Sequence, residues 1–376
     1  MKILIAPNAF KNSLDAVAAA QAICRGLQQS RLACECLQQP IADGGDGMLT
    51  VMLSQEGGER CRVRVDDPLG RPVEAEYGLL KGGKTAVIEM AEASGIRLLK
   101  TEELNPMKAS SYGTGQLISA ALDAGAEEIV IGIGGSATVD LGLGMAQALG
   151  VRLIDEEGRS VSGGGEGLQQ LQAIDMKGLD ERIKSTRIII TCDVTNVLME
   201  APSVFGPQKG ADENMVRQLE SEFARVGKMI ELSLGKNIVE TRHGGAAGGL
   251  GAALHAFLNA ELVNGTDYLL SRTGFHQALS EADVVITAEG ALDVQTQAGK
   301  GPFYVANAAR KQRKPVFMLA GSIPEDYSQD KYSVYDVVLP IGARPASLKE
   351  AIMDTDANLE RTALQIGNML SLKIKK

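Results

Sequence analysis

Residues Glu128–Thr138 read EIVIGIGGSAT and decide the class of fold. The apolar run Glu128–Ile131 predicts a short buried strand, and the glycines after it predict a tight loop. Residues Leu143–Leu149 then predict a helix. A strand, a glycine loop and a helix in this order are typical of an α/β protein that holds a phosphate group in the loop.

The segment Gly132–Gly144 could hold a phosphate without help from a lysine. Glycines let the backbone approach the ligand, and backbone N–H groups together with the helix N-terminus supply partial positive charge. Ser136 and Thr138 add hydroxyl donors. Two other interpretations stay open: a dinucleotide site of the type G-x-G-x-x-G/A, with Asp155 or Glu156 as the later acidic residue, or a turn that needs glycine only for packing.

Two further glycine-rich stretches have to be weighed against this one. Residues Gly78–Thr85, GLLKGGKT, fit the P-loop pattern G-x-x-x-x-G-K-[ST], but strand-like runs flank them on both sides, so we predict a hairpin turn at Lys81–Lys84 instead. Residues Gly244–Leu254, GGAAGGLGAAL, run into a helix-compatible stretch. They could form a second phosphate-binding loop or serve close helix packing.

The composition argues for a small-molecule partner. The 376 residues favour two domains, and 43 glycines are more than average usage gives. The net charge is −9 and no block of Lys or Arg stands out, which argues against nucleic-acid and membrane-surface roles. A monomer and a homodimer are both left open.

The numbers of cysteines and histidines limit which side chains can take part in catalysis. The five cysteines include no CxxC pair, so they are expected to be reduced thiols. With three histidines, carboxylates, lysines and backbone amides must carry the chemistry. No basic-then-apolar leader opens the chain and no apolar stretch approaches 18 residues, so we expect a cytoplasmic location.

The order of predicted elements indicates an α/β fold of two domains. The N-terminal strand Lys2–Ala6 and a helix capped by Ser13 form a βα unit, and the C-terminal part alternates in the same way. Both chain ends thus predict one doubly wound parallel sheet, with the strands Lys2–Ala6, Leu37–Ile41, Val284–Thr287, Val316–Leu319 and Val337–Ile341.

Alternating residues after Gly58 predict antiparallel hairpins, so the middle of the chain is expected to be an inserted mixed α/β domain. We place the first domain at residues 1–62 and 281–376 and the inserted domain at 63–280, with the active site in the cleft between them. The strands Ile129–Ile133 and Ile188–Thr191 could belong to either sheet.

Three acidic turns follow predicted strands, namely Asp43–Gly47, Asp193, and Glu289 with Asp293. Ligands of open α/β sheets collect at the carboxyl ends of strands. Several carboxylates converging there would suit Mg²⁺ coordination and a general base, whereas a single one could cap a helix.

Taken together, these stretches resemble the bacterial glycerate kinase family, whose glycerate 2-kinases have no Walker motif. The resemblance runs nearly end to end, through Ile5–Pro7, Phe10–Lys11, Ser13–Leu14, Ala42–Gly45, Ile88–Met90, Ala93–Gly95, Ser111–Gly115, Ile131–Thr138, Asp140, Cys192–Val194, Asn196, Phe205–Gly210, Gly244–Gly251, Glu289–Asp293, Gln295–Thr296 and Gly299–Lys300. It implies ATP- and Mg²⁺-dependent phosphorylation of D-glycerate to 2- or 3-phosphoglycerate, the former favoured. It also implies a flavodoxin-like domain and an inserted domain. Three positions depart from the family pattern: Asn8 replaces Asp, Val139 replaces Asn and Ala288 replaces Gly.

The resulting hypothesis is in-line transfer of the γ-phosphoryl group of ATP. Asp193 is the candidate base, with Asp43 and Asp293 as alternatives, and Lys11 would bind the substrate carboxylate or steady the transferring group. The candidate metal ligands are Asp43, Asp193 and Glu289. The candidate phosphate-binding residues are Gly134, Gly135, Ser136, Thr138, Gly248, Gly249 and Lys300. The competing functions are a nicotinamide-dependent oxidoreductase of a small hydroxy acid and a non-catalytic sensor of a phosphate ligand.

Overall fold

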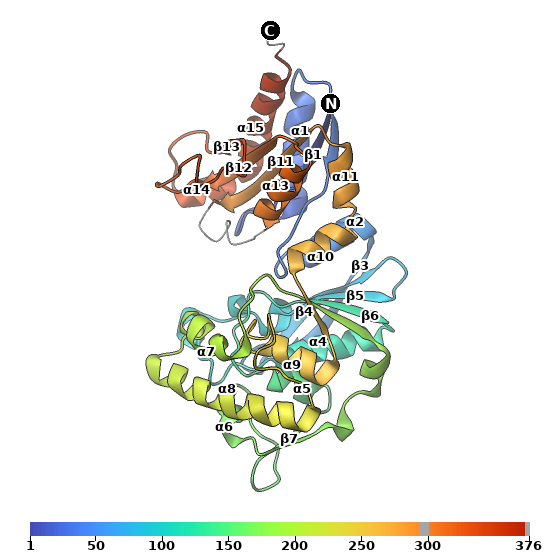
Figure 1. Cartoon of the computed structure of the whole chain (residues 1–376), viewed down its shortest axis with the longest axis vertical. Coiled ribbons are helices and arrows are strands. Elements are labelled where there is room, and N and C mark those ends of the chain that lie inside the picture. Colours follow the sequence, from blue (N-terminus) through green and yellow to red (C-terminus); the bar gives the residue numbers. More distant parts are fainter. Residues whose placement is uncertain (293–300, 373–376) are drawn as a thin grey trace. The chain divides into compact units, whose positions relative to one another are not determined.

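The computed structural model describes residues 1–292 and 301–372 (Figure 1). The chain divides into two compact units. We call residues 1–43, 50–55 and 266–376 the end unit, and residues 44–49 and 56–265 the middle unit. The predicted boundary near residue 62 falls inside strand β3 (Gly58–Asp66), which pairs along its whole length with β4 (Pro72–Leu80) of the middle unit.

The end unit is built on one sheet of five parallel strands. Its order is β13–β12–β11–β1–β2, which reads 2-1-3-4-5 when only these strands are counted along the chain. That order is the flavodoxin-like one, so the predicted doubly wound sheet from both chain ends is confirmed. The strands are β1 (Lys2–Ile5), β2 (Glu35–Gln38), β11 (Val284–Ala291), β12 (Val316–Ser322) and β13 (Val337–Pro340).

Helices cover both faces of this sheet (Figure 1). Side chains alternate along β1, so Ile3 and Ile5 pack with α1 and α15 while Leu4 packs with α11 and α13. The apolar runs of the strands are therefore buried on both sides, as a parallel sheet requires. The helices are α1 (Ala16–Gln29), α10 (Gly265–Arg272), α11 (Phe275–Glu281), α13 (Gly301–Lys311), α14 (Leu348–Met353) and α15 (Thr355–Leu370).

The start of α1 differs from the prediction. Asp15, not Ser13, is the N-cap, and its side chain accepts a hydrogen bond from the Ala18 amide at 2.8 Å. Ser13 instead donates its hydroxyl to the Ile352 carbonyl at 2.6 Å. Both side chains can cap a helix, and the contact with a residue far along the chain decided which of them does so.

The middle unit contains a mixed sheet of order β10–β9–β6–β5–β4–β3. The pairs β3–β4 and β4–β5 are antiparallel, and the remaining pairs are parallel. The two strands whose sheet the sequence left open, β6 and β9, both belong here. The other strands are β5 (Thr85–Glu89), β6 (Glu128–Gly132), β9 (Arg187–Thr191) and β10 (Glu261–Val263), and β7 (Arg152–Ile154) pairs with β8 (Ala173–Asp175) in a separate ribbon.

The P-loop-like residues form a hairpin turn, as predicted. Strand β4 ends at Leu80, and β5 starts at Thr85 and runs antiparallel to it. The Gly83 amide donates to the Leu80 carbonyl at 2.9 Å, and Gly82 and Gly83 both have positive φ. Two strands flank the glycines, so no helix N-terminus is available there to bind a phosphate.

Helices and short 3₁₀ turns surround the mixed sheet (Figure 1). The helices are α3 (Ala91–Ser94), α4 (Tyr112–Asp123), α5 (Leu143–Ala148), α6 (Gly165–Gln170), α7 (Ala201–Phe205), α8 (Glu213–Leu234) and α9 (Leu250–Leu258), while α2 (Met48–Glu56) has residues in both units. The 3₁₀ turns used below are η1 (Ile96–Leu98) and η6 (Pro207–Lys209). Among the residues that the structure describes, no helix combines the length and apolar character needed to cross a membrane.

Candidate active site

Three strands of the mixed sheet end side by side. Glu89 at the end of β5 pairs with Gly132 at the end of β6, and Gly132 pairs with Thr191 at the end of β9. The segments that follow these strands therefore start from one edge of the sheet, where ligands of open α/β sheets bind.

The turn Gly44–Asp46 and the glycine loop, residues 132–144, touch at this edge. A Cβ atom at Gly45 would lie 2.8 Å from the Cα atom of Gly134, so the two backbones approach as only glycine permits. A Cβ atom at Gly135 would lie 3.6 Å from both carboxylate oxygens of Asp46. The Gly44 amide donates to Oδ2 of Asp193, the residue two positions after β9. The acidic turn, the glycine loop and Asp193 thus meet at one place.

Three consecutive amides of the glycine loop have no protein partner in the described part of the chain: those of Gly134, Gly135 and Ser136. The amides on either side are occupied, Ile133 by the Thr191 carbonyl at 3.3 Å and Ala137 by the Ser94 carbonyl at 2.9 Å. Gly135 has φ +75°. Successive amides in a turn of this kind form a concave site for an anion.

Helix α5 does not offer its N-terminus to a ligand, and this part of the sequence-based expectation is wrong. Asp140 accepts hydrogen bonds from the amides of Gly142 at 3.1 Å and Gly144 at 3.3 Å. It also accepts from the amide and the hydroxyl of Ser111, each at 2.8 Å. Burial raises the pKa of the Asp140 carboxyl group, and these four donors oppose that effect. Asp140 is therefore an internal hydrogen-bond acceptor that already occupies the helix start.

A buried lysine lies against the same loop. Lys209, at the end of η6, donates from Nζ to the Ser136 hydroxyl oxygen at 2.6 Å and to the Thr138 carbonyl at 2.8 Å. Its side chain is 2% exposed. Burial lowers the pKa of Lys209 to about 7, and the charge of Asp140 acts in the opposite direction. A lysine from another segment therefore supports the loop, although not at a position that a phosphate-loop motif would identify.

The second glycine cluster supports the loop from another segment. A Cβ atom at Gly248 would lie 2.0 Å from the Thr138 carbonyl oxygen, and one at Gly249 would lie 3.0 Å from the Cα atom of Leu141. The Leu141 amide donates to the Gly248 carbonyl at 3.1 Å. Close packing therefore requires these glycines, and a direct phosphate contact by Gly248 or Gly249 stays a prediction.

A histidine positions the segment after β9. His243 Nδ1 lies 2.6 Å from the Val194 carbonyl, and because a carbonyl oxygen only accepts, Nδ1 carries the proton. His255 Nδ1 is bound in the same way to the Ala260 carbonyl, at 2.9 Å. Both histidines therefore hold the backbone.

The end unit gathers other predicted residues at the carboxyl edge of its own sheet. Asp43 accepts from Asn8 Nδ2 at 3.1 Å and from the Gly301 amide, at the start of α13, at 3.0 Å. A Cβ atom at Gly290, in β11, would lie 3.5 Å from the backbone nitrogen of Lys11, whose side chain is exposed. Three predicted site residues remain. Glu289 is buried in β11, and the predicted site residues Asp293 and Lys300 lie outside the described residues.

The predicted metal ligands supply suitable oxygen donors but not a complete protein cage. Among the described residues, no group of three or more His, Cys, Asp or Glu side chains is arranged to hold a metal ion. Mg²⁺ is usually bound by one or two carboxylates together with waters and substrate phosphates. Asp43, Asp193 and Glu289 fit that donor chemistry, and they stay predicted ligands.

Sequence reasoning did not assign roles to several residues around the loop. Arg97, in η1, forms an ion pair with Asp46 at 3.4 Å and a closer one with Glu92, while the neighbouring Ile96 amide donates to the Gly135 carbonyl at 2.9 Å. Glu89 accepts from the Leu49 amide at 2.8 Å, and burial raises its pKa to about 7. Glu89 lies in a stretch that carries the family resemblance and Arg97 lies outside those stretches, and nothing in the sequence shows which distant segment either side chain meets.

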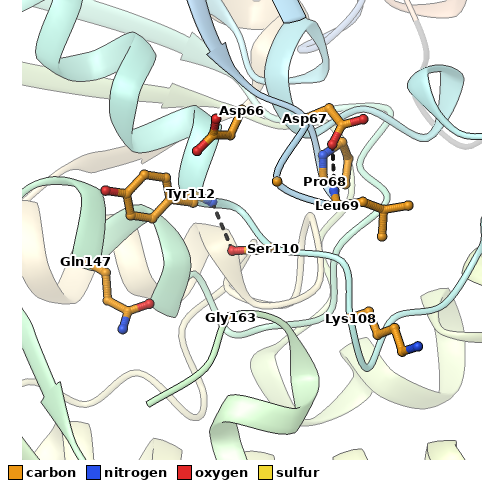
Figure 2. Close-up of a pocket in the computed structure, with 10 residues that line it drawn as sticks. Asp66, Asp67, Pro68, Leu69, Lys108, Ser110, Tyr112, Gln147 and Gly163 are labelled. Carbon is orange, nitrogen blue, oxygen red and sulfur yellow. Dashed lines mark hydrogen bonds between the residues drawn. The ribbon is translucent and has the colours of Figure 1, made fainter. Parts of the chain in front are cut away.

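A surface pocket of about 350 Å³ lies beside the start of α4 (Figure 2). Figure 2 shows the Tyr112 amide bound to the Ser110 hydroxyl oxygen, at 3.2 Å, and Gln147 of α5 on the same wall. Residues Gly134–Thr138 are not part of its lining. The pocket is therefore a separate feature from the loop amides. It is lined by Asp66, Asp67, Pro68, Leu69, Gly70, Lys108, Ser110, Tyr112, Gln147 and Gly163.

Fold and site together define the class of protein: a two-unit α/β protein with an open row of loop amides that suits an anion, and with a P-loop-like stretch that is a hairpin turn. The model of the Glycerate kinase family matches residues 3–371. The chain is 45% identical over 368 residues to a glycerate kinase of Halalkalibacterium halodurans, covering 97% of both chains. It is 40% identical over 378 residues to the glycerate 2-kinase of Escherichia coli, covering 100% of this chain and 99% of that one. A crystal structure from Salmonella typhimurium LT2 resembles it with a TM-score of 0.87 at 41% identity, covering 98% of both chains.

The chain belongs to the glycerate kinase family. Its activity is that of a glycerate kinase, a phosphotransferase with an alcohol group as acceptor. The family also implies the use of ATP.

Proposed function

We propose that this enzyme transfers the γ-phosphoryl group of ATP to the 2-hydroxyl group of D-glycerate, with Mg²⁺, and releases 2-phosphoglycerate and ADP. The name of the Escherichia coli relative, glycerate 2-kinase, favours this hydroxyl group over the 3-hydroxyl group. The enzyme is expected to act in the cytoplasm.

The observation that carries the proposal is the set of three unoccupied amides at Gly134, Gly135 and Ser136, counted over the described residues. Phosphate oxygens are acceptors, and preorganised amides stabilise their charge without any rearrangement. Thr138 and, from their own segments, Gly248, Gly249 and Lys300 are proposed to complete the binding of the ATP phosphates.

Asp193 is the proposed general base. The Gly44 amide fixes the orientation of its carboxylate, and the turn that supplies this amide also touches Gly134 of the loop. A carboxylate held in this way could accept the proton of the attacking hydroxyl group beside the phosphates. Asp43 and Asp293 are the alternatives, and Lys11 is proposed to bind the glycerate carboxylate or the transferring group.

Mg²⁺ would be held by Asp43, Asp193 or Glu289 and would neutralise charge on the phosphate oxygens. Because such sites are completed by the nucleotide, the protein ligands alone need not form a cage. The carboxylates would then bind the cation and accept the proton, whereas the loop amides would bind the phosphate.

The competing oxidoreductase interpretation loses one of its two candidate acidic residues, Asp155 and Glu156. Asp155 accepts the amides of Glu157 at 2.9 Å and Arg159 at 2.8 Å in the turn after β7. Family membership also favours turnover over the non-catalytic sensor.

Phosphorus NMR of a reaction containing ATP, Mg²⁺ and D-glycerate tests the proposal. We expect ADP and 2-phosphoglycerate to appear together, and L-glycerate to serve as the control acceptor that is not phosphorylated. A 3-phosphoglycerate signal would overturn the regiochemistry. Tight binding of NAD without binding of ATP, measured by calorimetry, would overturn the kinase proposal as a whole.

A further inference from the structure

We propose that Lys209 is a positioning residue that fixes the glycine loop and directs the Ser136 hydroxyl hydrogen toward a bound phosphate. The inference deepens the proposed function and rests on it, because it assigns a task to a side chain behind the loop that is proposed to bind ATP.

The backbone next to Lys209 is closely packed. Gly210, which follows η6, has φ +92°, and a Cβ atom there would lie 2.3 Å from the Leu104 carbonyl oxygen. The lysine side chain passes from this point into the protein, where it is 2% exposed, and its ammonium group lies 6.0 Å from the centre of the Phe205 ring. Lys209 thus reaches the loop from the inside of the middle unit.

The two hydrogen bonds of Lys209 bracket the loop. Nζ contacts the hydroxyl oxygen of Ser136 at 2.6 Å and the carbonyl oxygen of Thr138 at 2.8 Å. One side chain therefore ties together two residues on either side of Ala137, next to the three unoccupied amides. Removing it would leave the loop without this tie and the Thr138 carbonyl without this donor.

The chemistry of an ammonium group sets the direction of the Ser136 hydroxyl group. In its charged form Lys209 carries three donors and no acceptor, so the Ser136 oxygen then accepts from it. The Ser136 hydroxyl hydrogen is then left for another acceptor, and Ser136 is 7% exposed. With its amide also unoccupied, Ser136 can present two donors, which matches a phosphate group, whose oxygens only accept.

The charge of Lys209 also suits an anion on the loop. A buried cation is costly to desolvate, and burial accordingly lowers the pKa of this lysine while Asp140 opposes the change. A phosphate bound at the loop amides would add a second negative charge near the ammonium group. Nucleotide binding and the charged form of Lys209 would therefore favour each other.

The test is a double-mutant cycle in the full-length enzyme with Lys209→Met, Ser136→Ala and the double variant. We expect each single variant to raise the KM for ATP by about tenfold or more, the size of one lost charge-assisted hydrogen bond, and to change the KM for glycerate much less. The double variant should be no worse than Lys209→Met, because both changes remove the same interaction.

Lys236→Met is the matched control. Lys236 is also partly buried, donates to the His255 carbonyl at 2.9 Å, and has a pKa lowered by burial, but its partners lie outside the glycine loop. This variant should keep the wild-type KM for ATP. If Lys209→Met does not fold, Lys209→Gln, which keeps a donor in the core without the charge, tests the same claim.

The outcomes separate the inference from the proposed function. A raised KM for ATP in Ser136→Ala with an unchanged KM in the Lys209 variant, or effects that multiply in the double variant, would overturn the role of Lys209 alone. A KM for ATP that neither single variant changes would overturn the assignment of the loop to ATP. A Lys209 variant that has a lower unfolding temperature but the wild-type KM for ATP, beside a raised KM in Ser136→Ala, would make Lys209 merely structural.

Discussion

Single residues at the carboxyl edge of the mixed sheet are held by backbone amides that come from other segments. Asp193 is oriented by the Gly44 amide and Glu89 by the Leu49 amide. The two carboxylates differ in surroundings, because Glu89 is buried whereas Asp193 is only partly so. Asp193 is accordingly the better candidate for contact with substrate, and Glu89 for a role in stability.

Replacing Asp193 by Asn tests its role as the base. An amide cannot accept the hydroxyl proton, so kcat should fall by about a hundredfold or more while the affinity for ATP changes little. Steady-state kinetics with calorimetry of ATP binding would measure both. Near-normal turnover would remove Asp193 from the candidates and leave Asp43 and Asp293.

The raised pKa of Glu89 predicts a pH-dependent stability. Its carboxyl group titrates near 7 in the folded protein and near 4.5 when unfolded, so the folded state binds the proton more tightly. The contribution of Glu89 to the stability of the folded state is therefore fully present below pH 4.5 and is lost as the pH rises toward 7. Above pH 7, Glu89→Gln should be more stable than the wild type by up to about 3 kcal/mol, since a neutral amide avoids the buried charge.

Unfolding midpoints of Glu89→Gln and the wild type, measured from pH 4.5 to pH 8, would check this. Glu127→Gln is the control, because the Glu127 carboxylate is exposed and paired with Lys84. A difference between Glu89→Gln and the wild type that stays constant across the range would contradict the prediction.

At the scale of elements, the glycine loop is shaped by segments far from it in the chain. The turn Gly44–Asp46, the η6 lysine and the cluster Gly244–Gly251 all contact residues 132–141. The loop is therefore supported on several sides, and its open amides are kept in place by packing as well as by hydrogen bonds.

Adding one methyl group at Gly248 tests this support. In Gly248→Ala the new Cβ atom would meet the Thr138 carbonyl oxygen at 2.0 Å, so the loop must shift. We expect a lower unfolding temperature and a raised KM for ATP. Gly158→Ala is the matched control, because Gly158 also has positive φ, +80°, but a Cβ atom there would meet nothing within 4 Å. Equal effects in both variants would mean that backbone strain alone, not the contact with the loop, is responsible.

The strand and hairpin patterns could be predicted from the sequence because they depend on neighbouring residues. The turn at Lys81–Lys84 and the strands on both sides of it follow from local alternation. The cap of α1 and the state of the α5 N-terminus could not be predicted. The cap of α1 depends on a partner distant in the chain, Ile352 for Ser13, whereas Asp140 occupies the start of α5 through the nearby amides of Gly142 and Gly144 and is held there by the distant Ser111. Lys209 was overlooked for the same reason, since 73 residues separate it from Ser136.

At the scale of the whole molecule, the sequence predicted one parallel sheet from both chain ends and a mixed sheet from the middle. The structure confirms both sheets. Periodicity alone could not assign β6 and β9, because a buried parallel strand has the same apolar pattern in either sheet. The phosphate loop stays a prediction, but its structural basis differs from the expected one: open amides take the place of the helix N-terminus, and a buried lysine lies behind the loop.

The central claim is that the amides of Gly134, Gly135 and Ser136 bind the phosphates of ATP. Amide NMR of the deuterated, ¹⁵N-labelled enzyme, titrated with ATP and separately with adenosine, tests it most directly. We predict that ATP shifts the amide proton signals of these three residues downfield, as new hydrogen bonds to phosphate form, and that adenosine does not. Binding of ATP that leaves these three signals in place would contradict the account.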